Sequence, residues 1–332
     1  MDIESTFDAK VEKLSLMISS KFGEIFQELL GSYKEATGAN FTKTIPVWLL
    51  FIELLEEQLD HPFQFEPYHK KIRSPVDYYR FGIDFIYPIV DLPHSHVLGI
   101  DQVDQIAIHL AKGANVVLFA NHQSEADPQA IAVLLGRTHP ELAEKIIYVA
   151  GERVISDPLA IPFSMGCDLL CIYSKRYIDH PPELKREKQL HNKHTMERMS
   201  RLLQEGGKII YVAPGGGRDR RNAEGIVEVA PFDPDSIEMF HLMARKAKTA
   251  TYFYPLSIAT YHLLPPPETI QRELGEMRSI RRTPIHLFFG PSFDMEHFTG
   301  SEESDRLIRR KKRADAIWSL VNQQYQFLEG LP

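Results

Sequence analysis

The chain of 332 residues carries a net charge of −7, with 43% hydrophobic and 25% charged residues. This composition is that of a globular protein long enough for one large α/β domain, or for a large domain and a small one. The acidic balance argues against a nucleic-acid-binding protein, and no apolar run approaches the ~18 residues of a transmembrane helix.

The N-terminal sequence and the two cysteines both bear on the cellular compartment. The N-terminus, Met1-Asp2-Ile3-Glu4-Ser5, lacks the apolar core of a secretory signal and the Arg-rich character of a transit peptide. Cys167 and Cys171 lie close together in an apolar stretch, at a spacing that is neither a redox nor a zinc pattern. We therefore expect a soluble protein with buried free thiols in a reducing compartment.

Helical patterning dominates the first 60 residues. Apolar residues recur at helical spacing from about 7 to 35, which predicts one helix, and a second helix is predicted over 44–59. The stretch 60–75 is rich in Pro, His and aromatic residues, which favours a linker. We predict a helical N-terminal domain over 1–72 and an α/β domain over 73–332.

Short apolar runs then alternate with amphipathic segments. This alternation predicts a mainly parallel mixed sheet flanked by helices and preceded by the small helical domain. The predicted strands are 116–120, 145–150, 169–173, 208–213, 251–258 and 285–289, and the predicted helices are 128–135, 185–203 and 236–247.

A histidine and an aspartate follow the first predicted strand. His122 and Asp127 lie in the segment Asn121-His122-Gln123-Ser124-Glu125-Ala126-Asp127, and Pro128 then begins a helix with Asp127 near its N-cap. The intervening turn would let the carboxylate reach an imidazole nitrogen at the sheet edge where parallel α/β sheets bind ligands. A His held by an Asp can take a proton from a hydroxyl near neutral pH. The alternative is that Asp127 only caps its helix.

A glycine- and arginine-rich loop follows the strand at 208–213. Gly215, Gly216 and Gly217 would allow the backbone to approach a ligand, and Arg218 and Arg220 add fork-shaped donors suited to phosphate oxygens. The loop fits neither the G-x-G-x-x-G nor the P-loop pattern. The alternative is an ordinary loop with surface arginines.

A third strand, 169–173, also ends in positive charge, since Ser174 is followed by Lys175, Arg176 and Tyr177. The ends of parallel strands can meet at one edge of the sheet. The three strand ends together suggest a hydroxyl, activated by His122, on a molecule anchored by its phosphate.

These motifs, in this order, resemble the glycerol-phosphate acyltransferase superfamily, and most closely its soluble plastid branch with the bacterial relatives of that branch. The resemblance covers roughly residues 75–295, and the N-terminal helices fit the small helical domain of that family. The segments that carry it are 121–128, 149–159, 172–175, 213–220, 230–233, 253–257 and 265–267.

The resemblance implies a glycerol-3-phosphate 1-O-acyltransferase. Such an enzyme transfers a fatty acyl group from acyl-acyl-carrier protein or acyl-CoA to the sn-1 hydroxyl, giving lysophosphatidate in the first step of phospholipid synthesis. It implies His122 as general base and Asp127 as its orienting partner. The acceptor phosphate would be held by Arg218, Arg220, Lys175, Arg176 and Tyr177. No cofactor, metal or acyl-enzyme is expected.

The chain departs from the plant pattern at the third strand end. Arg176 and Tyr177 stand where plant enzymes typically have Lys and His. Arginine keeps the charge whereas tyrosine cannot be cationic near neutral pH, so Arg176 should contribute more to phosphate binding than Tyr177. The block 214–217 lacks the Glu-Gly-Thr that membrane-bound branches often show, which favours the glycerol-3-phosphate enzyme over a lysophosphatidate acyltransferase.

The partners and alternatives follow from the same resemblance. The basic groups 278–282 and 309–313 are candidates for docking the acidic carrier protein, with plain solvated faces as the alternative. No nucleic-acid partner is expected, and a peripheral membrane contact is left open. The compartment would be the bacterial cytoplasm or, for a mature form, the plastid stroma. Three other functions stay open: a lysophosphatidate acyltransferase, a non-catalytic phosphate- or lipid-binding scaffold, and a serine hydrolase with Ser124 or another serine as nucleophile.

Overall fold

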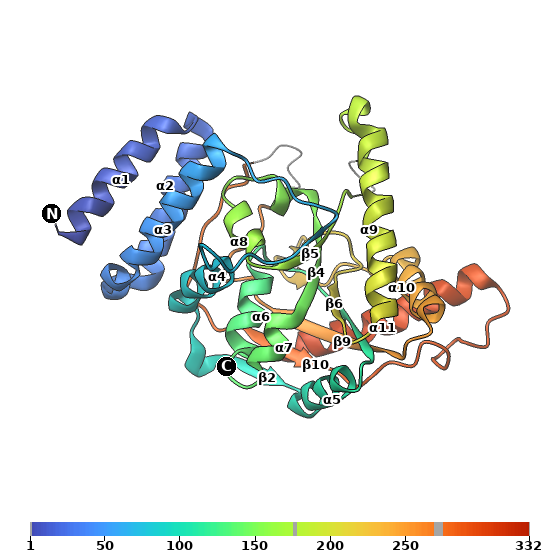
Figure 1. The fold of residues 1–332 in the computed structure, drawn as a ribbon. Coiled ribbons are helices and arrows are strands. Elements are labelled where there is room, and N and C mark those ends of the chain that lie inside the picture. The colour runs from blue at the N-terminus through green and yellow to red at the C-terminus, as the bar shows by residue number, and fades with distance from the viewer. Residues whose placement is uncertain (1, 175–177, 269–274, 332) are drawn as a thin grey trace.

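A mixed sheet forms the centre of the structure, which is a computed structural model describing residues 2–174, 178–268 and 275–331. Within these residues the sheet has eight strands in the order β1-β5-β4-β6-β3-β9-β10-β2 (Figure 1). The consecutive strands from β5 to β9 in that order are parallel, whereas β1 and β10 run antiparallel to their neighbours β5 and β9. The predicted mainly parallel mixed sheet is confirmed. The strand bounds are β1 (Tyr68–His69), β2 (His96–Leu98), β3 (Asn115–Ala120), β4 (Ile146–Gly151), β5 (Asp168–Ile172), β6 (Ile209–Val212), β9 (Thr251–Ala259) and β10 (His286–Phe289).

Both faces of the sheet are covered by helices, which is why its strands are continuous apolar runs. In β3, the side chains of Val116, Leu118 and Ala120 enter one hydrophobic core, whereas Val117 and Phe119 enter the other. The first core is closed by α4 (Tyr78–Ile86), α5 (Ile100–Ala111), α6 (Asp127–Leu135), α7 (Pro140–Lys145) and α8 (Ile161–Met165); the second is closed by α9 (Lys185–Glu205), α10 (Pro234–Ala247) and α11 (Arg306–Glu329).

The N-terminal helices are α1 (Ile3–Met17), α2 (Ser20–Thr37) and α3 (Phe41–Asp60). The single helix predicted from about 7 to 35 is wrong, because the chain is extended at Ile18 and Ser19, where ψ is 152° and 154°. Serine favours the N-cap position before a helix. The break lets α1 fold back on α3, where Lys13 pairs with Glu56 at 2.8 Å. The second predicted helix is confirmed as α3.

Aromatic side chains join this helical region to the α/β part of the chain. Trp48 and Phe51 of α3 pack on Phe85 of α4, and Phe51 also packs on Phe163 of α8. The hydroxyl of Tyr33 donates to the carbonyl of Phe85 at 2.8 Å. The two regions therefore share one hydrophobic core, and the division between residues 72 and 73 stays a prediction.

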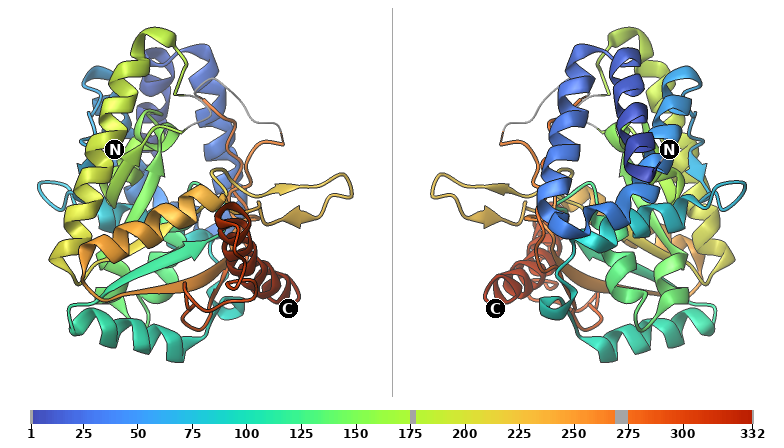
Figure 2. Two further views of the ribbon diagram at one scale, coloured as in Figure 1. Left: turned by 90° about the vertical axis from the view of Figure 1, so that its right-hand side faces the viewer. Right: turned by 90° about the vertical axis from the view of Figure 1, so that its left-hand side faces the viewer.

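The stretch 60–75 is more than a linker. Its residues Tyr68 and His69 form β1, which pairs with Leu170 and Leu169 of β5 and extends the sheet by one strand. Another element outside the predictions is a hairpin of β7 (Arg220–Arg221) and β8 (Val227–Glu228), which projects from the body of the molecule in Figure 2. Short 3-10 helices lie in the connections: η1 (Gly38–Asn40), η2 (Tyr87–Ile89), η3 (Leu92–His94), η4 (Glu152–Ile155) and η5 (Pro182–Leu184).

Two smaller observations bear on the compartment and the membrane. Cys167 and Cys171 are free and buried, as predicted, and burial raises the pKa of each thiol to about 12, so neither is reactive. In the part of the chain that the structure describes, no helix is both long and apolar enough to cross a bilayer.

Candidate active site

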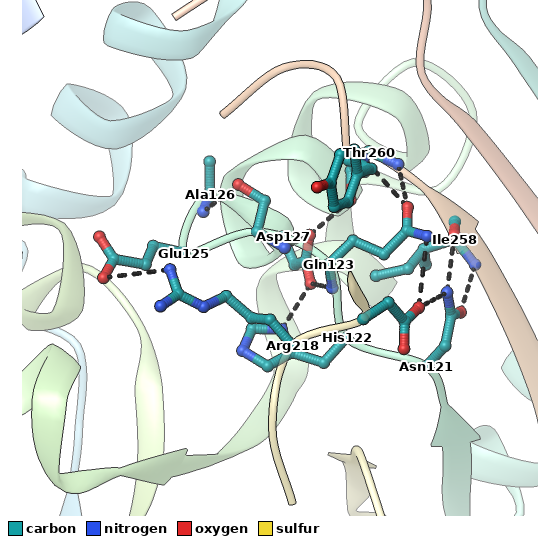
Figure 3. Close-up of polar contacts among 12 residues, drawn as sticks. Asn121, His122, Gln123, Glu125, Ala126, Asp127, Arg218, Ile258 and Thr260 are labelled. Atoms are coloured by element: carbon teal, nitrogen blue, oxygen red, sulfur yellow. Dashed lines mark hydrogen bonds and ion pairs between the residues drawn. The ribbon is translucent and has the colours of Figure 1, made fainter. Parts of the chain in front are cut away.

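His122 and Asp127 form a hydrogen-bonded pair where β3 ends. His122 follows the strand, Asp127 is the first residue of α6, and the turn between them brings Nδ1 of the imidazole to 2.7 Å from Oδ2 of the carboxylate (Figure 3). The Asp127 side chain is 2% exposed and that of His122 is 31% exposed. A buried carboxylate thus holds an imidazole that solvent and ligands can reach.

The carboxylate of Asp127 is saturated with donors. Besides the imidazole, Oδ2 accepts the backbone N–H of Gln123 at 2.9 Å, and Oδ1 accepts the N–H of Ser124 at 3.0 Å and the hydroxyl of Thr260 at 2.6 Å. A carboxylate that only accepts requires Nδ1 of His122 to carry the proton, which leaves a lone pair on Nε2. Among the described residues Nε2 has no partner. It is therefore available to a substrate hydroxyl.

The two alternatives for this motif do not fit the geometry. The N-cap of α6 is Ala126, and the Asp127 carboxylate bonds N–H groups that precede the helix, so capping does not explain it. Ser124 is completely buried, and its Oγ accepts the N–H of Ala126 at 3.1 Å. A hydrolase with Ser124 as nucleophile is therefore wrong for this chain.

Two amides fasten the motif to β9. Asn121 exchanges hydrogen bonds with the backbone of Ile258, at 2.9 and 3.0 Å, and Oε1 of Gln123 accepts the N–H groups of Thr260 and Tyr261 at 2.8 and 3.0 Å. Residues that neighbour His122 in sequence thus anchor it to a strand more than 130 residues away. Sequence reasoning missed these roles, and missed Thr260 altogether.

Asp219 joins the glycine-rich loop to the motif. Its N–H donates to the carbonyl of His122 at 2.6 Å, and its carboxylate accepts from Asn121 at 2.8 Å, Gln123 at 3.3 Å and the N–H of Ala230 at 3.0 Å. The residue is 1% exposed. Burial raises the pKa of Asp219 to about 6, although its hydrogen bonds oppose this shift.

This raised pKa predicts how stability depends on pH. Since the folded value of about 6 exceeds the ordinary 3.8, the folded chain binds the extra proton, and its stabilising effect is lost as pH rises from about 4 through 6. We expect the free energy of unfolding of the native chain, relative to Asp219→Asn, to fall by about 2 kcal/mol between pH 4 and 7. Urea denaturation at several pH values measures this difference, and a pH-independent difference would contradict the assignment.

Gly215 and Gly216 are each required by the structure of the loop, for different reasons. Gly216 has φ of +68°, and a Cβ on Gly215 would lie 3.0 Å from Cβ of Ala230. The loop can therefore turn tightly at Gly216 and pack closely against Ala230.

Arg218 is not a surface arginine. Its side chain is 11% exposed, with Nη2 bonded to the Glu276 carboxylate and Nη1 at 3.6 Å from Glu125. Arg220 is partly buried, and its Nε is enclosed without a partner among the described residues. Burial, and next the charge of Arg218, lower the pKa of Arg220. An arginine with an unsatisfied donor next to a second cation favours binding of an anion.

Further charges extend this cluster. Arg278 donates to Glu125 and to Asp157, each at 2.9 Å, and Arg153 of η4 donates to Glu276. Burial raises the pKa of Glu125, but Arg278 and Arg218 outweigh it and hold the pKa below its ordinary value. An alternating chain of carboxylates and arginines therefore lies beside His122. Sequence reasoning missed Arg153, Glu276 and Asp157, because each looks like an ordinary charged residue.

Part of the docking prediction is wrong. Arg278 and Arg313 are each 6% exposed, the former in the cluster above and the latter paired with Glu238 and bonded to the carbonyl of Met295 at 2.9 Å. Charges buried in internal ion pairs cannot dock a partner. Arg281, Arg282 and Lys311 do lie at the surface, so for these members of the two groups docking stays a prediction.

The third strand end lies partly outside the described residues. β5 ends at Ile172, one residue before the predicted end, and Lys175, Arg176 and Tyr177 belong to the residues that the structure does not describe. Their assignment to the phosphate stays a prediction.

The fold and the site define a class: an α/β protein with a hydrogen-bonded His–Asp pair and an adjacent arginine cluster, an arrangement suited to acting on an anionic molecule that bears a hydroxyl. Residues 97–259 match the family model described as Acyltransferase. The chain is similar to the proteins named "Glycerol-3-phosphate acyltransferase, chloroplastic" from three plants. The identity is 37% for Arabidopsis thaliana (82% of this chain, 59% of that protein), 38% for Spinacia oleracea (82% and 58%) and 39% for Carthamus tinctorius (81% and 58%).

This similarity to plastid-type glycerol-3-phosphate acyltransferases over 81–82% of the chain confirms the resemblance seen in its motifs. The chain spans 58–59% of the length of these three relatives.

Proposed function

We propose that this chain is a glycerol-3-phosphate 1-O-acyltransferase, which transfers a fatty acyl group from a thioester donor to the sn-1 hydroxyl of glycerol-3-phosphate to give lysophosphatidate. The observation that carries the proposal is the free Nε2 of His122, held by Asp127, beside arginines that retain unsatisfied donors. The names of the relatives support the same reaction.

The reaction is direct acyl transfer. Nε2 of His122 removes the proton from the sn-1 hydroxyl as that oxygen attacks the thioester carbonyl, and Asp127 stabilises the resulting imidazolium. The carbon–sulfur bond then breaks, and the thiolate takes the proton from the imidazolium as it leaves. Since Ser124 is buried, the acyl group passes straight from donor to acceptor.

The acceptor is anchored through its phosphate. Arg218 and Arg220 flank Asp219, whose N–H bonds the carbonyl of His122 at 2.6 Å, so the backbone of the two arginines runs close to that of His122. Glycerol-3-phosphate is short enough for its phosphate to reach these arginines while the far hydroxyl meets His122. Lys175 and Arg176 complete the proposed phosphate ligands.

Assays of the purified chain with two acceptors and two donors test the proposal. Glycerol-3-phosphate and lysophosphatidate are each offered with acyl-acyl-carrier protein and with acyl-CoA, and the products are identified by mass spectrometry. We expect 1-acyl-glycerol-3-phosphate as the main product. A preference for lysophosphatidate would assign the chain to the next acylation step, and phosphate binding without any transfer would make it a scaffold.

The arginine assignment predicts a defect in binding. Arg220→Ala should raise the KM for glycerol-3-phosphate about ten- to a hundred-fold, with kcat much less affected, because one charge-assisted contact to the phosphate is lost. The matched control is Arg221→Ala, which removes the same charge from an exposed neighbour. Equal KM values for Arg220→Ala and the native chain in steady-state kinetics would place the phosphate elsewhere.

The donor and the compartment belong to the same proposal. Acyl-acyl-carrier protein or acyl-CoA supplies the acyl group, and the plant relatives are named chloroplastic, which favours the plastid stroma. The bacterial cytoplasm and a peripheral membrane contact stay predictions.

A further inference from the structure

Glu276 places a carboxylate between two arginines at the site. Its Oε1 accepts from Nη1 of Arg153 and its Oε2 from Nη2 of Arg218, and its side chain is 5% exposed. Each oxygen of this buried carboxylate thus accepts a hydrogen bond from a different arginine. Fork-shaped arginine donors bind phosphate oxygens in the same way.

The donors of Arg218 are already committed in this arrangement. Nη2 faces Glu276, and Nη1 lies 3.6 Å from Glu125. Arg218 can offer both terminal nitrogens to a phosphate only if one of these carboxylates gives way. Glu125 is held by Arg278 at 2.9 Å, and that arginine is in turn held by Asp157 at 2.9 Å. Among the described residues, the carboxylate of Glu276 bonds only Arg153 and Arg218, the donors that a phosphate would use, so Glu276 is the carboxylate that a phosphate would replace.

Unsatisfied donors adjoin Glu276 on both sides. Nη2 of Arg153 and Nε of Arg220 are buried and have no partner among the described residues. The positive charges of Arg218 and Arg153 contribute, after burial, to lowering the pKa of Arg220. Glu276 thus bonds two arginines and acts through its charge on a third, and a dianion with three oxygens would satisfy their donors more fully.

We propose that Glu276 is an internal competitor for the phosphate of the acceptor: it occupies the anion site when no phosphate monoester is bound, and so sets the affinity for the acceptor. The identity of that acceptor rests on the proposed function. A buried phosphate dianion beside a retained carboxylate would be repelled, since like charges in a buried site disfavour each other. Binding of the phosphate therefore displaces the Glu276 side chain.

Only the side chain has to move. The backbone around Glu276 is anchored by the N–H of Gly275 on Asp157 at 3.3 Å, by Arg278 on the Glu276 carbonyl at 3.2 Å, and by the N–H of Ile280 on Ser32 of α2 at 3.0 Å. Rotation about the side-chain bonds of Glu276 would free Arg153 and Arg218 without disturbing these contacts. The competing possibility is that Glu276 permanently orients the two arginines, and this predicts the opposite effect of its removal.

The test is Glu276→Gln, which keeps the shape of the side chain and removes its charge. Titration calorimetry without any acyl donor measures binding of glycerol-3-phosphate and, separately, of inorganic phosphate. We expect both ligands to bind about ten-fold more tightly, because a charge-assisted contact no longer has to be broken. In turnover assays the KM for glycerol-3-phosphate should fall by a similar factor while kcat is not increased. Glu302→Gln, an equal charge change at the surface, should leave both affinities unchanged.

Weaker or unchanged phosphate binding by Glu276→Gln would overturn the proposal, because a permanent positioning role predicts weaker binding. Glu276→Ala provides a second variant, which should also bind phosphate more tightly. Loss of the fold in both variants, seen by circular dichroism, would equally overturn it, since a displaceable side chain cannot be essential for folding. Tighter phosphate binding in a chain with no acyl transfer would uphold the inference and reject the proposed function.

Discussion

Replacing His122 by alanine should reduce kcat by about 10²–10⁴-fold or more, while glycerol-3-phosphate binds almost as well as to the native chain. In the proposed mechanism the imidazole removes the proton from the attacking hydroxyl, whereas separate arginines on the loop after β6 hold the phosphate. Single-turnover kinetics of acyl transfer and calorimetric titration of the acceptor measure the two quantities independently.

A second His–Asp pair provides the control for this variant. His297 lies on the surface with its Nδ1 at 3.0 Å from Oδ2 of Asp294, the same atoms as in the site. His297→Ala should retain the native rate, because this pair is exposed and lies outside the candidate site. A native-like rate for His122→Ala, or an equal loss in both variants, would contradict the assignment of the base.

Asp127→Asn should lower kcat by about 10³–10⁴-fold while the chain stays folded. The carboxylate accepts four hydrogen bonds, from Gln123, Ser124, Thr260 and His122, and an amide can only accept at its oxygen. Its NH2 group would face donors, so the imidazole would lose both its tautomer and its orientation. The variant should also lose about 1–3 kcal/mol of unfolding free energy.

Asp294→Asn serves as the control for Asp127→Asn, since it makes the same chemical change at an exposed His–Asp pair. Chemical denaturation and steady-state kinetics on both variants separate loss of stability from loss of chemistry. If Asp127→Asn kept most of its kcat, the carboxylate would have only a structural role.

The sheet was predictable because its strands are buried on both faces. A run such as 116–120 is apolar throughout, and the polar or glycine-rich residues that follow mark its end, so all six predicted strands occur close to their expected bounds. The His–Asp pair was predictable because it lies within one short turn. The helix break at Ile18 was not, since apolar periodicity continues across Ser19 and hides the change of direction.

The rest of the site depends on contacts between distant parts of the chain. Thr260 reaches Asp127 across 133 positions, and Arg278 reaches Glu125 across 153. No local pattern indicates such a partner. Arg278 is an example. Its position next to Arg281 and Arg282 suggests a member of a solvent-exposed basic group, yet the fold buries it between two carboxylates. A charge in an acidic chain can be internal, and only the packing reveals it.

The most direct test of the central claim is a crystal structure of the chain with glycerol-3-phosphate bound. We predict that its sn-1 hydroxyl lies within hydrogen-bond distance of Nε2 of His122 and that its phosphate contacts Arg218 and Arg220. A phosphate bound away from these arginines, or a hydroxyl that does not approach His122, would contradict the account.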